Sequence, residues 1–204
     1  MFESLRNRKH YYIGEELRRH YAVMIPLVEH ERQICVVFEV RSADIERQPG
    51  EICLPGGGRE NDESSKETAV RETCEELLVK REQIDVICEM DTLLNERREE
   101  VHVYLGKIND YAGTFSADEV AEVFMVPLDW FIENDPDIYT CHTLYEFPED
   151  FPFEKLPGGK DYKWRSPDRD VYFYTWNGRV IWGLTGRVMS SAAQIIRREA
   201  AQNL

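Results

Sequence analysis

The stretch from Gly57 to Val79 constrains this chain most, because it places three glutamates on one face of a predicted helix. Glu72, Glu75 and Glu76 stand at positions i, i+3 and i+4, a spacing that stacks side chains one above another. Stacked carboxylates repel one another and weaken a helix, whereas a divalent cation bound between them makes the arrangement favourable. Hard cations such as Mg²⁺ take oxygen ligands, commonly carboxylates together with substrate phosphates. The stretch therefore indicates a metal site for phosphate chemistry.

The neighbouring residues also favour a helix. Val70, Cys74 and Leu77 fall opposite the glutamates, as on a helix that packs one side against a core. Polar capping residues predict that the helix begins near residues 62–65. A glycine-rich run, residues 54–58, comes just before it and allows a backbone to approach a ligand closely. A solvated acidic face on a surface helix is the alternative interpretation, and the glycine run favours the metal site.

The same stretch resembles the signature of the Nudix hydrolases. In that signature a glycine is followed by a spaced glutamate, then by Arg-Glu, Glu-Glu and an aliphatic residue. The matching residues are Gly57, Glu63, Arg71, Glu72, Glu75, Glu76 and Val79. Thr73 replaces an aliphatic residue and Leu78 replaces the second glycine, so we expect the helix to end without the usual glycine turn. The resemblance implies an α/β fold, an α/β/α sandwich around a mixed β-sheet.

A metal-dependent pyrophosphatase needs metal ligands, residues that orient them and a general base. We expect Glu72, Glu75 and Glu76 to ligate Mg²⁺ or Mn²⁺, which polarises phosphoryl oxygens and lowers the pKa of bound water. Arg71 and Glu63 are expected to orient these carboxylates. In Nudix enzymes the general base is a signature glutamate or one from a distant loop. Two remote candidates are Glu119 and Glu122, of which Glu119 is preferred, with an exposed acid at a strand edge as the alternative.

A second segment narrows the substrate. It resembles the extra motif of the coenzyme A pyrophosphatase branch, in which an Arg-Ser pair is followed by an arginine, a glycine and Phe-Pro-Gly-Gly. Here the second arginine stands one place late and Leu54 replaces the phenylalanine. Guanidinium groups bind phosphate in bidentate fashion, and the alternative for each arginine is a surface cation without function. The predicted substrate-binding residues are Arg41, Ser42, Arg47, Gly56 and Gly57.

The branch resemblance implies hydrolysis of the pyrophosphate bond of coenzyme A or acyl-CoA. The products would be adenosine 3′,5′-bisphosphate and 4′-phosphopantetheine or its acylated form. The late Arg47 and the replaced phenylalanine leave open a Nudix pyrophosphatase for another nucleoside diphosphate derivative, such as ADP-ribose or a dinucleotide. A third possibility, from a different class, is a nucleotide-sensing module that has lost turnover.

Composition excludes several other classes. The net charge of −14 disfavours binding to nucleic acid or to acidic membranes. No apolar run approaches the length of a membrane span, and residues 1–20 lack a signal-peptide pattern. Five scattered cysteines indicate reduced thiols and a cytoplasmic location. The five histidines show no zinc spacing, so we expect structural roles for them.

A length of 204 residues is typical of one domain, and we predict an N-terminal arm or helix (1–20) and a single Nudix hydrolase domain (21–204).

Residues 145–170 are rich in proline, aromatic and charged residues. We interpret them as a long ordered loop that covers the substrate or contacts a second copy in a homodimer. The alternative is a mobile insertion. Trp182 is expected in the core. Strands are predicted at 21–28, 33–40, 84–90, 101–108, 119–126, 171–176 and 179–182, and helices at 129–133 and 184–200.

Overall fold

A computed structural model gives the fold of this chain and describes residues 6–9, 13–14, 18–95, 97–165 and 168–202. Much of the predicted arm at 1–20 lies outside the described residues, and its last two residues, Arg19 and His20, belong to the first strand. The strands and helices, in chain order, are β1 (Arg19–His30), β2 (Gln33–Arg41), β3 (Ile52–Cys53), β4 (Gly56–Gly58), α1 (Ser65–Leu77), β5 (Ile84–Glu89), β6 (Leu93–Leu94), β7 (Glu99–Ile108), β8 (Val120–Pro127), α2 (Leu128–Glu133), β9 (Asp137–Cys141), β10 (Arg169–Trp176), β11 (Arg179–Trp182) and α3 (Gly183–Gln202).

The main sheet is mixed and is built around β1 and β2. Its strands follow the order β3-β2-β1-β7-β5, with β8 on β2, β6 on β7 and β4 on β1. The pairing of β1 with β7 is parallel, whereas β1 with β2 and β2 with β8 are antiparallel. The long segment between β1 and β7 contains α1, as a parallel pairing requires a long connection.

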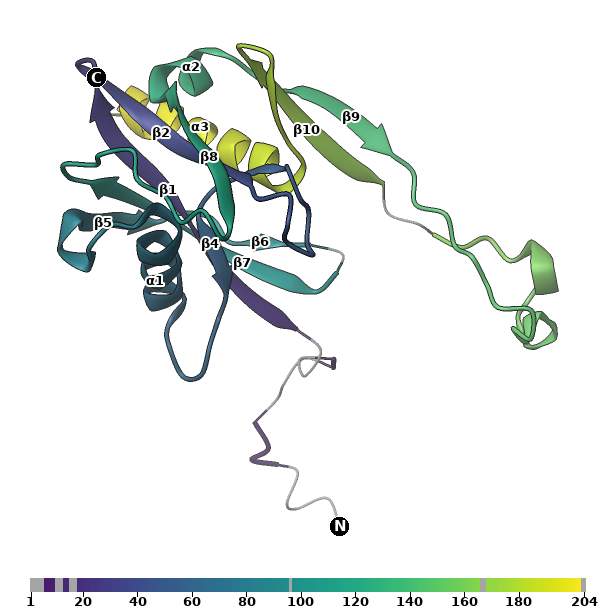
Figure 1. Cartoon of the computed structure of the whole chain (residues 1–204). Helices are drawn as coiled ribbons and strands as arrows, with labels where there is room; N and C mark the ends of the chain where they lie inside the picture. Colours follow the sequence, from purple (N-terminus) through teal and green to yellow (C-terminus); the bar gives the residue numbers. More distant parts are fainter. Residues whose placement is uncertain (1–5, 10–12, 15–17, 96, 166–167, 203–204) are drawn as a thin grey trace.

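Helices cover both faces of this sheet (Figure 1). Successive residues of a strand point to opposite faces, and β1 shows this clearly. Ala22 and Met24 pack in one buried cluster with Leu77 of α1. Val23 belongs to the cluster on the other face, which contains Phe131 of α2 and several residues of α3. The α/β/α sandwich around a mixed sheet, expected from the Nudix resemblance, is confirmed.

Both ends of α1 are capped. Ser64 and Glu67 form a reciprocal capping box at the N-terminus, within the predicted start region. At the C-terminus Leu78 has φ 51° and ψ 44°, the left-handed conformation that glycine normally adopts. The expectation that the helix ends without this turn is therefore wrong. A non-glycine residue there costs roughly 1 kcal/mol, and the turn allows Val79 to pack beside Leu77 in the core.

The C-terminal half adds a small three-stranded sheet, in the order β11-β10-β9. The predicted hairpin is confirmed: Asn177 and Gly178 have φ 48° and 80°, as a type I′ turn requires. The sequence did not reveal β9, because all five of its residues are exposed and show no alternation. Trp182 was expected in the core, yet it is 41% exposed and stacks on Phe173, with 5.9 Å between ring centroids.

The segment between β9 and β10 projects away from the rest of the molecule (Figure 1). It holds two short 3₁₀ turns, Phe153–Lys155 and Gly159–Asp161, and residues 169–170, predicted as loop, belong to β10. The aromatic side chains of this segment that contact one another are Tyr145, Phe147, Phe151, Phe153, Tyr162 and Trp164. A role as substrate cover or homodimer contact stays a prediction.

Two further expectations concern the environment of the protein. All five cysteines are free thiols, in agreement with the scatter seen in the sequence. Within the described residues, no helix is both long and apolar enough to cross a membrane. The cytoplasmic location stays a prediction.

Candidate active site

The glycine-rich run forms the strand β4 rather than an open turn. Gly56 and Gly58 pair with Val23 and Tyr21 of β1, so β4 is part of the main sheet, and α1 packs against it. A Cβ atom on Gly56 would overlap the backbone of β1, and its φ of 156° also favours glycine. A Cβ atom on Gly57 would overlap the carboxylate of Glu72. Glycine at these two positions therefore allows α1 to bring its carboxylates directly against backbone.

Glu76 is the most buried carboxylate of α1. Its side chain is 4% exposed, and its Oε2 accepts a 2.8 Å hydrogen bond from the backbone N–H of Gly56. Burial raises the pKa of Glu76 to about 8, and the nearby negative charges of Glu72 and Glu119 act in the same direction. The site therefore holds a carboxyl group that stays partly protonated near neutral pH in the absence of a cation.

Arg71 connects the acidic residues of the signature. Its guanidinium contacts Glu63 at 3.0 and 3.2 Å, Glu72 at 3.0 Å and Glu75 at 3.0 Å, and Nη2 donates to the carbonyl of Gly58 at 3.2 Å. The hydrogen bonds from Arg71 hold the pKa of Glu63 at about 2. The predicted orienting pair of Arg71 and Glu63 is thus brought together, and it ties α1 to the loop that precedes it.

The three predicted metal ligands are not equivalent. Glu72 and Glu76 are largely buried against β4, whereas the side chain of Glu75 is 59% exposed. Burial raises the pKa of Glu72. Their ligand atoms do not all lie within 4.8 Å of one another; among the described residues only a different cluster meets that criterion. The three carboxylates repel one another, and Arg71 is held between Glu72 and Glu75. A cation would therefore compete with Arg71 for both of these glutamates.

Sequence reasoning missed Glu39. It lies in β2, is 1% exposed, and its Oε1 is buried without a hydrogen-bond partner, while Oε2 accepts a weak 3.8 Å contact from the Cys53 thiol. Burial, followed by the charge of Glu76, raises the pKa of Glu39 well above its usual range. The sequence did contain a signal for this residue, because Glu39 is a charged residue that interrupts an apolar run. In the structure it shares its face of β2 with Val37, which packs beside α1.

The two remote base candidates have different surroundings. Glu122 is bound by both terminal nitrogens of Arg179, at 2.6 and 3.0 Å. Glu119 is exposed, precedes β8, and its charge acts on Glu39, Glu72 and Glu76. The loop before Glu119 is attached to the end of α1, where the N–H of Ser116 donates to the carbonyl of Glu76 at 2.7 Å. Of the two candidates, Glu119 is the one whose charge acts on these carboxylates, whereas Glu122 is paired with Arg179.

The predicted substrate-binding residues surround the same carboxylates only in part. The positive charge of Arg41 acts on Glu39 and Glu76, and its Nε donates to the carbonyl of Arg47 at 3.1 Å. Ser42 is buried, and its N–H donates to the carbonyl of Glu119 at 2.7 Å. The side chain of Arg47 is exposed, so the structure shows a positioning role for its backbone alone.

Comparison with known proteins identifies the family. The family model described as NUDIX domain matches residues 18–145. The chain belongs to the Nudix hydrolase family. It is 28% identical to the peroxisomal coenzyme A diphosphatase NUDT7 of Mus musculus, covering 88% of this chain and 71% of that one. It is 26% identical to Nudix hydrolase 3 of Caenorhabditis elegans, covering 86% and 72%. A solved Caenorhabditis elegans Ap4A hydrolase has 23% identity and a TM-score of 0.47, covering 55% and 83%.

Nudix enzymes generally use divalent metal ions, and the residues present suit such an ion. Glu72, Glu76 and Glu39 supply only carboxylate oxygens, the donor type that hard cations prefer. The unpartnered Oε1 of Glu39 and the raised pKa of Glu76 both show that the protein itself does not fully stabilise negative charge on these carboxylates. A cation next to them would supply that balance.

Gly57→Ala should weaken divalent metal binding, because the new methyl group occupies the place of the Glu72 carboxylate. We expect Mn²⁺ affinity to fall by at least about tenfold, which corresponds to 1.4 kcal/mol, measured by isothermal titration calorimetry. Gly58→Ala is the matched control, since the nearest atom to its added methyl is the Tyr21 ring at 3.8 Å. Equal Mn²⁺ affinities in the two variants would show that close approach to Gly57 is unimportant.

The stability of the metal-free protein should fall as pH rises from about 4.5 to about 8. The raised pKa of Glu76 means that the folded state holds a proton which the unfolded state has already released in this range. Glu39 and Glu72 are shifted in the same direction, while Glu63 titrates below the range. We expect a loss of up to about 5 kcal/mol, measured by urea unfolding with a chelator. The slope should flatten in Glu76→Gln, and an unchanged slope contradicts the assignment.

Proposed function

We propose that this Nudix hydrolase cleaves the pyrophosphate bond of coenzyme A or acyl-CoA, using Mg²⁺ or Mn²⁺. The observation that carries the proposal is Arg41, whose positive charge acts on the buried carboxylates Glu39 and Glu76 and which lies within a segment that resembles the coenzyme A pyrophosphatase motif. The similarity to a coenzyme A diphosphatase over most of the chain supports the same substrate. The products are adenosine 3′,5′-bisphosphate and (acyl-)4′-phosphopantetheine.

In this proposal Glu72, Glu75 and Glu76 would hold the cation, with the buried carboxyl group of Glu39 close enough to Glu76 for their charges to interact. When bound, the cation polarises the phosphoryl oxygens and lowers the pKa of water. A cation held there would favour the deprotonated form of Glu76, because its positive charge would offset the burial that raises the pKa of this carboxyl group. Arg71 keeps Glu72 in place through contacts with Glu63 and the Gly58 carbonyl.

Glu119 serves as the general base. Its side chain is exposed, so water reaches it, and the attachment of its loop to the end of α1 keeps it near the carboxylates. It accepts a proton from the attacking water, while the departing phosphate retains the oxygen of the broken anhydride bond. The alternative is a signature glutamate as the general base. Glu76 suits this role less well than Glu119, because one of its oxygens already accepts a hydrogen bond from Gly56.

Arg41 and Arg47 bind the phosphates of the substrate, and Ser42 fixes the turn between them. Among the described residues no carboxylate lies within ion-pair distance of the Arg41 guanidinium, while a backbone carbonyl fixes its Nε. A guanidinium that is oriented but not neutralised is suited to an anionic ligand. The absence of side chains on Gly56 and Gly57 lets Glu72 and Glu76 pack directly against the β4 backbone, which fixes these carboxylates where the phosphates are proposed to bind.

The test is product analysis by liquid chromatography and mass spectrometry. Coenzyme A, ADP-ribose and NADH are incubated separately with Mg²⁺ or Mn²⁺ and the native chain, Glu76→Gln or Glu122→Gln. We expect adenosine 3′,5′-bisphosphate from coenzyme A, a decrease of at least about 100-fold in Glu76→Gln, and near-native turnover in Glu122→Gln, because Glu122 is paired with Arg179 outside the site.

Two outcomes would overturn parts of the proposal. Cleavage of ADP-ribose or NADH without cleavage of coenzyme A would retain the pyrophosphatase chemistry and reject the substrate. Binding of coenzyme A without any product, with either cation, would favour a nucleotide-sensing module.

A further inference from the structure

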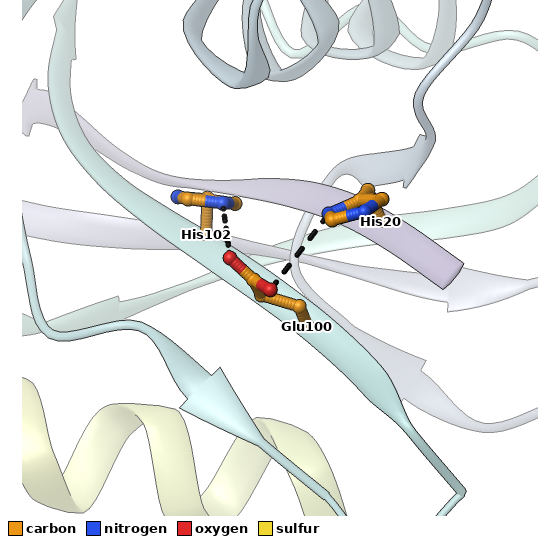
Figure 2. Close-up of side chains that lie close together, drawn as sticks. All are labelled: His20, Glu100 and His102. Atoms are coloured by element: carbon orange, nitrogen blue, oxygen red, sulfur yellow. Dashed lines mark ion pairs between the residues drawn. The ribbon is translucent and has the colours of Figure 1, made fainter. Parts of the chain in front are cut away.

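A second group of possible metal ligands lies away from Glu72 and Glu76. The side chains of His20, Glu100 and His102 come together on the neighbouring parallel strands β1 and β7 (Figure 2). In the strand register His20 is paired with Glu100, and Ala22 with His102. Because alternate residues share a face, all three side chains point to the face of the sheet that α1 covers.

The donor atoms of this triad have a spacing that suits a metal ion. His102 Nε2 lies 3.1 Å from Glu100 Oε1, and His20 Nδ1 lies 3.9 Å from Glu100 Oε2. One ligand atom from each residue lies within 4.8 Å of both others. Zinc binds histidine nitrogen and carboxylate oxygen at about 2.0–2.2 Å in tetrahedral geometry, which requires ligand atoms about 3.4 Å apart. The triad needs little rearrangement to reach this spacing.

Neighbouring side chains already orient two of the three ligands. His102 Nδ1 contacts Glu89 Oε1 at 2.8 Å, so the other ring nitrogen, Nε2, faces Glu100. A carboxylate on the far nitrogen is the usual partner of a metal-binding histidine. Arg18 Nη1 donates a hydrogen bond to Glu100 Oε2 at 2.7 Å, and the other carboxylate oxygen, Oε1, faces His102. Glu89 offsets the positive charge that Arg18 brings near the triad.

The surroundings provide access and partial burial. The side chains of His20, Glu100 and His102 are 35%, 21% and 22% exposed. His20 and His102 line a cavity of about 470 Å³, whose other walls come from the loop before α1 and the start of that helix. Water from this cavity can fill a fourth coordination position, as in zinc sites with three protein ligands.

We propose that His20, Glu100 and His102 bind a divalent transition-metal ion of the zinc type. Two imidazoles favour Zn²⁺ over Mg²⁺, which prefers oxygen, so this ion differs from the cation held by the glutamates of α1. The sequence shows no zinc spacing, because His20 and His102 are distant in the chain and meet only through the parallel pairing of β1 and β7. A bound ion links these two strands at the end where β1 enters the sheet.

The test is titration of the metal-free full-length chain with Zn²⁺ alone, by competition with a chromophoric chelator. The variants are His20→Gln and His102→Gln, with His142→Gln as control, because His142 is an exposed histidine paired with Asp168. We expect one Zn²⁺ per chain whose affinity falls at least about 100-fold in either triad variant and is unchanged in the control. Equal Zn²⁺ binding by the native chain and both triad variants would overturn the proposal.

A second measurement avoids dependence on the folding of the variants. Nitrogen-15 spectra of the native side-chain imidazoles, recorded with and without one equivalent of Zn²⁺, should shift for His20 and His102 and not for His142. Absence of a shift at both triad histidines would overturn the proposal. Because no substrate is present, failure here leaves the pyrophosphatase proposal untouched.

Discussion

The contacts of Arg71 hold together the part of the structure on which the rest depends. One guanidinium binds Glu63, Glu72 and Glu75 and the carbonyl of Gly58, so it joins the preceding loop, β4 and α1. Without it, like charges along α1 would repel one another and Glu63 and Gly58 would lose their hydrogen bonds to the guanidinium. The bidentate, planar guanidinium is suited to this task in a way that a lysine ammonium is not. The guanidinium thus offsets the repulsion between these carboxylates and fixes their positions.

The site also carries an energetic cost that makes sense only with a ligand. Glu39 and Glu76 are both buried, and negative charges on the two would repel each other. One oxygen of Glu39 also has no hydrogen-bond partner. Buried polar groups without partners destabilise a fold by about 1–3 kcal/mol each. Folded proteins retain such groups mainly where they act on a ligand. The large two-sided core of the sandwich compensates for this cost, since the sheet is packed by α1 on one face and by α2 and α3 on the other.

The sequence predicted what depends on local patterns and missed what depends on long-range contacts. The fold was predictable from the resemblance to the Nudix signature, and the N-terminus of α1 and the Asn177-Gly178 hairpin were predictable from capping and turn chemistry. The left-handed Leu78 was not, because the packing of Val79 outweighs the preference of leucine. Glu39 and the pairing of His20 with Glu100 depend on which strands become neighbours. The unequal exposure of Glu75 and Glu76 depends on the contact of α1 with β4.

The central claim is that carboxylates from α1, facing β4 and Glu39, form a site for a hard divalent cation. Crystals grown with Mn²⁺ and measured at an X-ray wavelength where manganese scatters anomalously test it most directly. The account predicts an anomalous peak coordinated by Glu72 and Glu76, with Arg71 moved away from at least one of its glutamate partners. A structure with Mn²⁺ at saturating concentration and no peak beside Glu72 and Glu76, with Arg71 still bridging Glu72 and Glu75, would contradict it.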